Sequence, residues 1–342
     1  MNLNEHDDEE ERDLFDVMRD RMAPEHQKAG NVLDKVNEVY VTTGRDDALR
    51  KRFDRFLTFV TAKQRHGRRG KGNAFFVTGE SGAGKTDIIE HLLMDHPVLQ
   101  PVHHRSRLIK PWIRIALQGP ATLRVLGADI LAAIQYNVKS TARQAEVWRI
   151  LPDQLADAKV FLVHIDETQH LMAKGADTEA VASAIKGLMN HMPWPVSFIL
   201  SGKPRLNDLI VHDDQAERRN FSLALPPVDA KLDDDRELIV QIIEEHCKAA
   251  GLKCTKLVDT DVPERIAHAA NFQFGRMCEV VITAIHIAVL RNAAELERDH
   301  FIRAYRDHSH TSGDDEMNPF FADTWDHLTP GYFVTNGQER DQ

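Results

Sequence analysis

The strongest constraint on this chain is a glycine-rich stretch that joins an apolar segment to a helical pattern. The apolar segment spans 74–78, and a pattern typical of a helix spans 87–93. In such a strand, loop and helix unit the backbone N–H groups of the loop face inward and form an anion site at the start of the helix. The sequence therefore predicts a phosphate-binding loop. Its residues are Gly79, Glu80, Ser81, Gly82, Ala83, Gly84, Lys85 and Thr86.

The last two residues of this loop carry the chemistry of a nucleoside triphosphate site. The ammonium of Lys85 can reach the β- and γ-phosphates, and the hydroxyl of Thr86 can bind the Mg²⁺ that bridges them. A glycine-rich turn without a ligand is the alternative, but such a turn does not require Lys and Thr at this spacing. We therefore expect ATP and Mg²⁺ as cofactors.

Two consecutive carboxylates follow another apolar segment, 160–165. Asp166 would hold Mg²⁺ through its water shell beside Thr86, and Glu167 could orient and partly deprotonate the attacking water. The pair indicates ATP hydrolysis as well as binding, whereas an acidic cap on the following helix is the alternative. His164 is interpreted as a core or sheet-face residue without a chemical role.

Polar side chains also follow the apolar segment at 196–200. The carboxyl ends of neighbouring parallel strands meet at one edge of a sheet, where ligands of such folds bind. Ser201 or Lys203 could therefore sense the γ-phosphate, and a plain turn is the alternative.

Three arginines are candidates for further contacts with phosphates. Arg218 and Arg219 precede the last apolar segment of the core. Either could be inserted against the γ-phosphate of a neighbouring subunit, which would make activity depend on an oligomer, and a surface ion pair is the alternative. Arg276 opens a long apolar helix and could lie on a small domain that closes over the phosphates. A helix-opening arginine without a ligand is the other reading.

The composition restricts the class of protein. With a formal net charge of −10, the chain lacks an overall basic field, so any DNA contact must be local. The basic, glycine-punctuated segment 63–72 is either such a contact or a solvated linker. Three cysteines without CxxC spacing encode neither a disulfide framework nor a zinc site. The acidic N-terminus and the lack of a long apolar run argue against a signal peptide and a membrane partner, so we expect a cytoplasmic protein.

Alternating strand-like and helix-like segments predict an α/β fold, a doubly wound parallel sheet with helices on both faces. An apolar stripe at helical spacing predicts a helix over 44–64. Besides the strand before the phosphate-binding loop, we predict strands at 112–117, 160–165, 196–200 and 221–225. The predicted domains are an acidic arm (1–43), an α/β core (44–228), a small all-helical lid domain (229–308) and a tail (309–342).

With these residues in place, the chain resembles the AAA+ ATPases and, among them, the TniB and TnsC group of transposition regulators. The resemblance covers about 44–290, and the segments that carry it are 79–86, 165–171, 201–206, 217–221 and 275–276. By resemblance the ATPase residues are Lys85, Thr86, Asp166 and Glu167, with Arg218 or Arg219 acting in trans and Arg276 acting from the lid. Lys203 departs from the family, which commonly has a small hydroxyl residue there.

The resemblance implies a protein that binds ATP, assembles on double-stranded DNA as a ring or helical filament, and marks the target for a partner transposase. The implied partners are a DDE transposase, a TniQ-type target-recognition protein and further copies of the chain. The DNA contacts implied by the family are Thr122 and Arg124, with Lys110 behind them. A loader for a replicative helicase and a nucleotide-gated scaffold without a DNA role are the alternatives.

Overall fold

The computed structural model describes residues 13–104, 107–172, 175–207, 220–308 and 315–331. These residues form two compact units. One is Thr43–Pro226, which differs from the expected core, 44–228, only at its ends. The other joins the described residues up to Thr42 to those from Pro227 onward, so the N-terminal segment expected to be a separate arm packs with the C-terminal helices.

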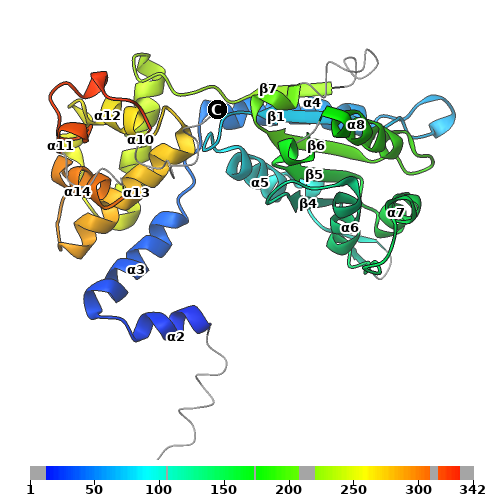
Figure 1. Cartoon of the computed structure of the whole chain (residues 1–342), viewed down its shortest axis with the longest axis horizontal. Coiled ribbons are helices and arrows are strands. Elements are labelled where there is room, and N and C mark those ends of the chain that lie inside the picture. Colours follow the sequence, from blue (N-terminus) through cyan, green and yellow to red (C-terminus); the bar gives the residue numbers. More distant parts are fainter. Residues whose placement is uncertain (1–12, 105–106, 173–174, 208–219, 309–314, 332–342) are drawn as a thin grey trace, which may run out of the picture. The chain divides into compact units, whose positions relative to one another are not determined.

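A parallel sheet forms the centre of the first unit (Figure 1), which confirms the predicted fold class. In the described residues it has five strands in the order β4-β5-β6-β1-β7, and every neighbouring pair is parallel. The strands are β1 (Ala74–Thr78), β4 (Trp112–Ala116), β5 (Leu162–Asp166), β6 (Ser197–Gly202) and β7 (Asn220–Ala224). All five therefore present their carboxyl ends at one edge of the sheet.

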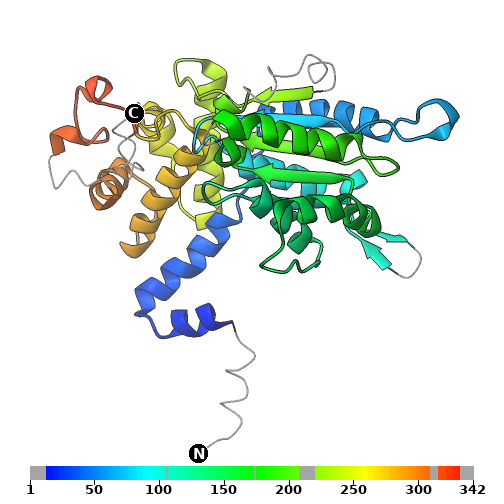
Figure 2. The same cartoon turned by 45° about the vertical axis from the view of Figure 1, so that its right-hand side comes forward.

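Helices cover both faces of this sheet because successive strand residues point to opposite sides. On β1, Phe75 and Val77 join the core under one pair of helices, whereas Phe76 joins the core under the other three helices. The pair consists of α4 (Gly44–Thr61) and α5 (Lys85–Asp95). The other face carries α6 (Leu123–Ala133), α7 (Gln144–Ala158) and α8 (Gly175–Asn190), the last of which crosses the front of the unit in Figure 2.

Short elements complete the first unit. A separate antiparallel pair, β2 (Val102–His104) and β3 (Arg107–Ile109), was not predicted from the sequence. The helical pattern expected after Glu167 forms a 3-10 helix, η3. The 3-10 helices of this unit are η1 (Arg65–Gly67), η2 (Pro97–Leu99), η3 (Thr168–Met172) and η4 (Pro204–Asn207).

The second unit is helical, and its core includes residues from both ends of the chain. Ala29 and Val36 on α3 pack into the same cluster as the buried faces of α10 and α13. The described part of the expected tail also packs here, because Phe320 is fully buried against Phe301 at 5.2 Å between ring centres. The elements are α2 (Leu14–Asp20), α3 (Pro24–Asn37), α10 (Asp233–Ala250), α11 (Thr255–Val258), α12 (Val262–Ala269), α13 (Phe274–Leu290), α14 (Arg298–His308), η5 (Asp315–Met317) and η6 (Trp325–His327).

Among the described residues no single helix has the length and apolar character needed to cross a membrane. Only α12 and α13 taken together are long and apolar enough, and the chain bends by 115° between them.

Candidate nucleotide-binding site

The loop after β1 has the backbone of an anion-binding turn. Gly82 and Gly84 adopt φ values of 82° and 83°, a left-handed conformation that glycine adopts without strain. A Cβ on Gly79 would lie 3.0 Å from the Ala83 side chain and 3.1 Å from the carbonyl of Leu225, so this position also favours glycine. The turn leads directly into α5, whose first residue is Lys85. The strand, loop and helix unit predicted from the sequence is thus present.

Lys85 lies folded against the loop that precedes it. Its Nζ donates hydrogen bonds to the carbonyl oxygens of Gly79 at 2.9 Å and Glu80 at 2.8 Å. Burial lowers the pKa of this ammonium, and the nearby carboxylates of Glu167 and Asp166 oppose that shift. The positive charge is therefore held within the turn by neutral carbonyl groups, where phosphate oxygens would compete for the same donor.

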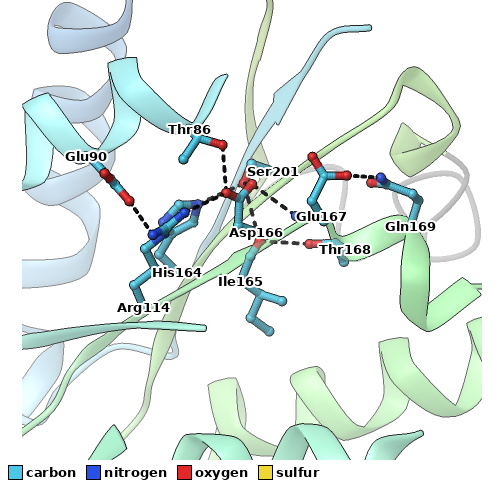
Figure 3. Close-up of polar contacts among 10 residues, drawn as sticks. All are labelled: Thr86, Glu90, Arg114, His164, Ile165, Asp166, Glu167, Thr168, Gln169 and Ser201. Carbon is cyan, nitrogen blue, oxygen red and sulfur yellow. Dashed lines mark hydrogen bonds and ion pairs between the residues drawn. The ribbon is translucent and has the colours of Figure 1, made fainter. Parts of the chain in front are cut away.

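A hydrogen bond joins the loop to β5 (Figure 3). Thr86 Oγ1 donates to Asp166 Oδ2 at 2.8 Å, although the two residues are eighty positions apart in the sequence. Asp166 ends β5 and Thr86 lies in the first turn of α5, so the sheet edge brings both predicted metal-binding side chains together.

Asp166 is the most heavily engaged side chain of the site. Its Oδ1 accepts from Ser201 Oγ at 2.6 Å and from the backbone N–H of Glu167 at 3.0 Å. Its Oδ2 accepts from Thr86 and from Arg114 Nη2 at 3.1 Å. Burial on its own raises the pKa of this carboxyl, but the hydrogen bonds outweigh burial and leave the pKa below its ordinary value. Asp166 is therefore ionised at neutral pH.

Arg114 belongs to the site although no sequence motif indicated it. It lies on β4, in register with His164 on the neighbouring β5. One end of its guanidinium contacts Asp166, and Nη1 forms an ion pair with Glu90 of α5. A polar residue within a short apolar strand was the only available signal, and that signal does not distinguish a site residue from an exposed one.

Ser201 and His164 form a buried relay behind Asp166. His164 Nε2 lies 2.8 Å from Ser201 Oγ, and both side chains are fully buried. Burial lowers the pKa of His164 to about 4, so the ring is neutral at neutral pH and its Nε2–H donates to Ser201 while the hydroxyl donates to Asp166. Ser201 was predicted as a candidate γ-phosphate sensor, and its hydroxyl donates a hydrogen bond to Asp166. His164 is linked to Asp166 through Ser201.

Glu167 is held in place by Gln169, another residue that the sequence did not single out. Gln169 Nε2 donates to Glu167 Oε2, and its Oε1 accepts from the backbone N–H of Lys203 at 3.2 Å. A Cβ on Gly202 would lie 2.3 Å from that amide oxygen, so glycine there makes room for the bridge. Glu167 itself has a φ of 54°, which turns the chain sharply after Asp166.

The side-chain oxygens at the carboxyl edge of the sheet are suitable ligands for Mg²⁺. Mg²⁺ usually takes one or two protein oxygens and completes its shell with water and substrate phosphates. The Thr86 hydroxyl and the Asp166 carboxylate supply such a pair. Across the described ranges no group of three or more His, Cys, Asp or Glu side chains forms a denser metal site.

Sequence comparison decides the family. Residues 42–229, more than half of the chain, match the family described as "Bacterial TniB protein". The chain belongs to the TniB family. No curated protein matches it.

Solved structures similar to this TniB-family chain include three proteins with the AAA+ fold. CDC6P from Pyrobaculum aerophilum has a TM-score of 0.58 at 11% identity, and the match covers 80% of this chain and 70% of that one. The Aeropyrum pernix ORC1 protein in complex with DNA has a TM-score of 0.55 at 18% identity, covering 81% and 69%. The Aeropyrum pernix ORC2 protein in ADPNP-ADP complexes has a TM-score of 0.52 at 15% identity, covering 78% and 69%. These likenesses establish the AAA+ fold.

Three further arginines of the TniB-family chain were predicted for the site. Arg276 is in the first turn of α13, in the helical unit. Arg218 and Arg219 fall outside the described residues.

The three predicted DNA contacts do not share one edge of the sheet. Lys110 precedes β4, whereas Thr122 and Arg124 follow it. Thr122 caps α6 by accepting from the backbone N–H of Val125 at 3.3 Å. Arg124 Nε donates to the carbonyl of Ala142 at 2.8 Å, and its Nη2 donates to that of Ser140. Both side chains thus have local structural partners.

Proposed function

We propose that this chain is a Mg²⁺-dependent ATPase that binds nucleotide at the carboxyl edge of its sheet. The observation that carries the proposal is the 2.8 Å hydrogen bond between Thr86 and Asp166, with Glu167 as the next residue. This contact places a hydroxyl, an ionised carboxylate and a second carboxylate beside an anion-binding turn. A site that only stored nucleotide would not require the second carboxylate.

Each residue has a separate role in this proposal. The loop N–H groups and Lys85 bind the phosphates, while Thr86 and Asp166 hold Mg²⁺, which offsets the phosphate charge when bound. Ser201 and His164 keep the Asp166 carboxylate oriented. Glu167 orients the attacking water and accepts its proton once Gln169 no longer holds the carboxylate.

The proposed biological role is target selection for transposition. Membership of the TniB family supports a cytoplasmic protein that assembles as a ring or filament on double-stranded DNA and recruits a DDE transposase, with a TniQ-like protein as a further partner. A DNA complex among the similar structures supports DNA as a ligand for this fold. In the assembled state, Arg218 or Arg219 would complete the site of a neighbouring subunit, and Arg276 would act from the helical unit.

The test is ATP turnover by the purified full chain, with and without duplex DNA, followed by electron microscopy with a non-hydrolysable ATP analogue. We expect turnover to rise on addition of duplex and DNA-dependent rings or filaments to form. If duplex DNA does not change ATP turnover and no rings or filaments form, the DNA role is contradicted and a nucleotide-gated scaffold is favoured. If a DDE transposase is encoded next to the gene, adding that transposase to the DNA-bound chain would test recruitment.

A further inference from the structure

Cationic side chains line up along the amino edge of the sheet, opposite the nucleotide site. Lys110 lies just before β4, Lys159 just before β5 and Lys71 just before β1. Trp194 lies just before β6, which separates β5 from β1. Because neighbouring strands are about 4.8 Å apart, four adjacent strand starts extend over about 14 Å. We call Lys71, Lys110 and Lys159, together with Lys63, Arg68 and Arg69 of the adjoining loop, the amino-edge row.

The loop that supplies half of this row has a defined fold. It connects α4 to β1 and lies at the end of β1 opposite α5 (Figure 1). Lys63 and Arg69 pair as an antiparallel bridge, and Gln64 N–H donates to the carbonyl of Arg68 at 2.9 Å. The turn between them uses His66 and Gly67 at positive φ. The backbone that carries these cations is thus fixed by its own hydrogen bonds.

Trp194 fastens the loop to the start of β5. The guanidinium carbon of Arg69 lies 3.9 Å from the centre of the indole ring, and the Lys159 ammonium lies 5.1 Å from it. The indole Nε1 donates to the carbonyl of Val160 at 2.7 Å, which fixes the ring. Gly72 then passes so close to Val196 that a Cβ would lie 2.0 Å from its carbonyl oxygen. Two cations therefore lie within about 5 Å of one indole ring that is only partly buried.

The charge of this edge is not balanced locally. The segment 63–71 contains five Lys or Arg residues and no acidic residue, in a chain whose formal net charge is −10. Lys63, Arg68, Lys71 and Lys110 are exposed. Within the ranges that the structure describes, no ion pair involves any of these four side chains. A local cationic surface on an acidic protein indicates a polyanionic partner.

We propose that the amino-edge row binds the phosphate backbone of duplex DNA. The inference rests on the proposed DNA-binding function and assigns its contact surface. Phosphates of one B-DNA strand are spaced about 3.4 Å apart along the helix axis, so a row of about 14 Å spans about four phosphates. Contacts of this kind position a protein without reading the sequence. Lys110 belongs to this surface, whereas Thr122 and Arg124 lie at the opposite edge of the sheet.

The test compares two triple variants of the full chain that lose the same charge. The row variant is Lys63→Gln, Arg68→Gln and Lys71→Gln. The control is Lys35→Gln, Lys248→Gln and Arg291→Gln, three exposed positions of the helical unit. Binding of a fluorescent duplex of arbitrary sequence is measured by anisotropy at several salt concentrations. Binding of a fluorescent ATP analogue at the opposite edge reports that both variants are folded.

We expect the row variant to bind duplex about tenfold or more weakly, while the control binds within about twofold of the unchanged protein. The slope of log K against log salt should fall by about 2.7 in the row variant, because three phosphate contacts are lost at about 0.9 each. A second variant, Lys71→Gln with Lys110→Gln, samples both ends of the row and should lower the slope by about 1.8.

Three outcomes would overturn the inference. Duplex binding that is unchanged in both row variants would place the contact elsewhere and leave the proposed DNA function intact. If the row variant and the control lose duplex affinity equally, the loss comes from the change in net charge and not from the amino-edge row. Failure of the unchanged protein to bind duplex would refute both the inference and the proposed DNA function. The first two outcomes would refute the inference alone.

Discussion

At the scale of single residues, Asp166 is where the two halves of the proposed ATPase chemistry meet. One carboxylate oxygen accepts hydrogen bonds from Thr86 and Arg114. The other accepts hydrogen bonds from Ser201 and from the backbone N–H of Glu167. A carboxylate with four donors stays ionised and has few orientations available to it. The arrangement that would hold Mg²⁺ is thus fixed by hydrogen bonds within the protein.

Arg114 places a positive charge beside the Asp166 carboxylate, which would hold Mg²⁺. We expect Arg114→Gln to lower the Mg²⁺ concentration for half-maximal binding of a fluorescent ATP analogue by about threefold to tenfold, or about 0.7 to 1.4 kcal/mol. The control is Arg50→Gln, which removes an exposed ion pair with Asp95 elsewhere in the same unit. An unchanged or higher Mg²⁺ requirement in Arg114→Gln would show that the guanidinium does not oppose the metal.

His164 makes the stability of the α/β unit depend on pH. Its pKa is lowered to about 4 by burial, below its ordinary 6.5, so between these values the unfolded chain binds a proton that the folded chain does not. The free energy of unfolding therefore falls as the pH drops from 6.5 toward 4, by up to about 3 kcal/mol from this group.

The variant His164→Gln keeps a donor for Ser201 but does not titrate. We expect the unchanged protein to lose more stability than His164→Gln in urea unfolding between pH 7 and pH 4.5. Equal losses in the two proteins would mean that His164 is already protonated in the folded chain or reaches solvent.

The residues of the site divide by whether a local pattern marks them. Lys85, Thr86, Asp166 and Glu167 were predictable because the spacing of a phosphate-binding loop and a strand ending in two carboxylates is local in sequence. The contact between Thr86 and Asp166 then follows from the parallel sheet. Arg114, His164 and Gln169 were not predictable as site residues, since their roles depend on strand register and side-chain packing.

At the scale of elements, α4 has a buried stripe that the spacing of apolar residues predicted. Leu49, Phe53, Phe56 and Leu57 are buried, and a capping box between Thr43 and Asp46 starts the helix. The antiparallel pair β2 and β3 was missed because it has no buried face, with Val102 and Leu108 more than half exposed. The packing of α3 with α10 and α13 was missed because sequence spacing does not show which distant helices share a core.

Two phenylalanines on α4 allow a matched test of this stripe. Phe53 is fully buried, with its ring centre 5.9 Å from that of Phe75, whereas Phe59 is 54% exposed. We expect Phe53→Ala to lower the free energy of unfolding by about 3 to 5 kcal/mol because it leaves a cavity. Phe59→Ala should cost less than about 1 kcal/mol. Similar losses in urea unfolding for the two variants would contradict the assigned packing of α4.

At the scale of the whole molecule, the sheet would serve two ligands at its two edges. Nucleotide lies at the carboxyl edge in this account, and the amino-edge row faces DNA. The proposed trans-acting arginine would add a neighbouring subunit to the nucleotide edge, so that hydrolysis depends on assembly.

Mixing two inactive variants tests this dependence on a neighbour. We expect Lys85→Ala and the double variant Arg218→Ala with Arg219→Ala each to lose ATP turnover. A mixture should regain up to about a quarter of normal activity, because some interfaces pair an intact loop with an intact arginine. No recovery in mixtures that still assemble on DNA would refute a role in trans.

The central claim, that Glu167 drives hydrolysis of a nucleotide bound beside Asp166, is tested most directly by Glu167→Gln in the full chain, with Glu179→Gln on α8 as the control. ATP turnover and the affinity for a fluorescent ATP analogue are measured on the same samples. We predict a turnover loss of about hundredfold or more in Glu167→Gln, with nucleotide affinity within about threefold of normal and the control unaffected. Turnover at the normal rate in Glu167→Gln would contradict the account.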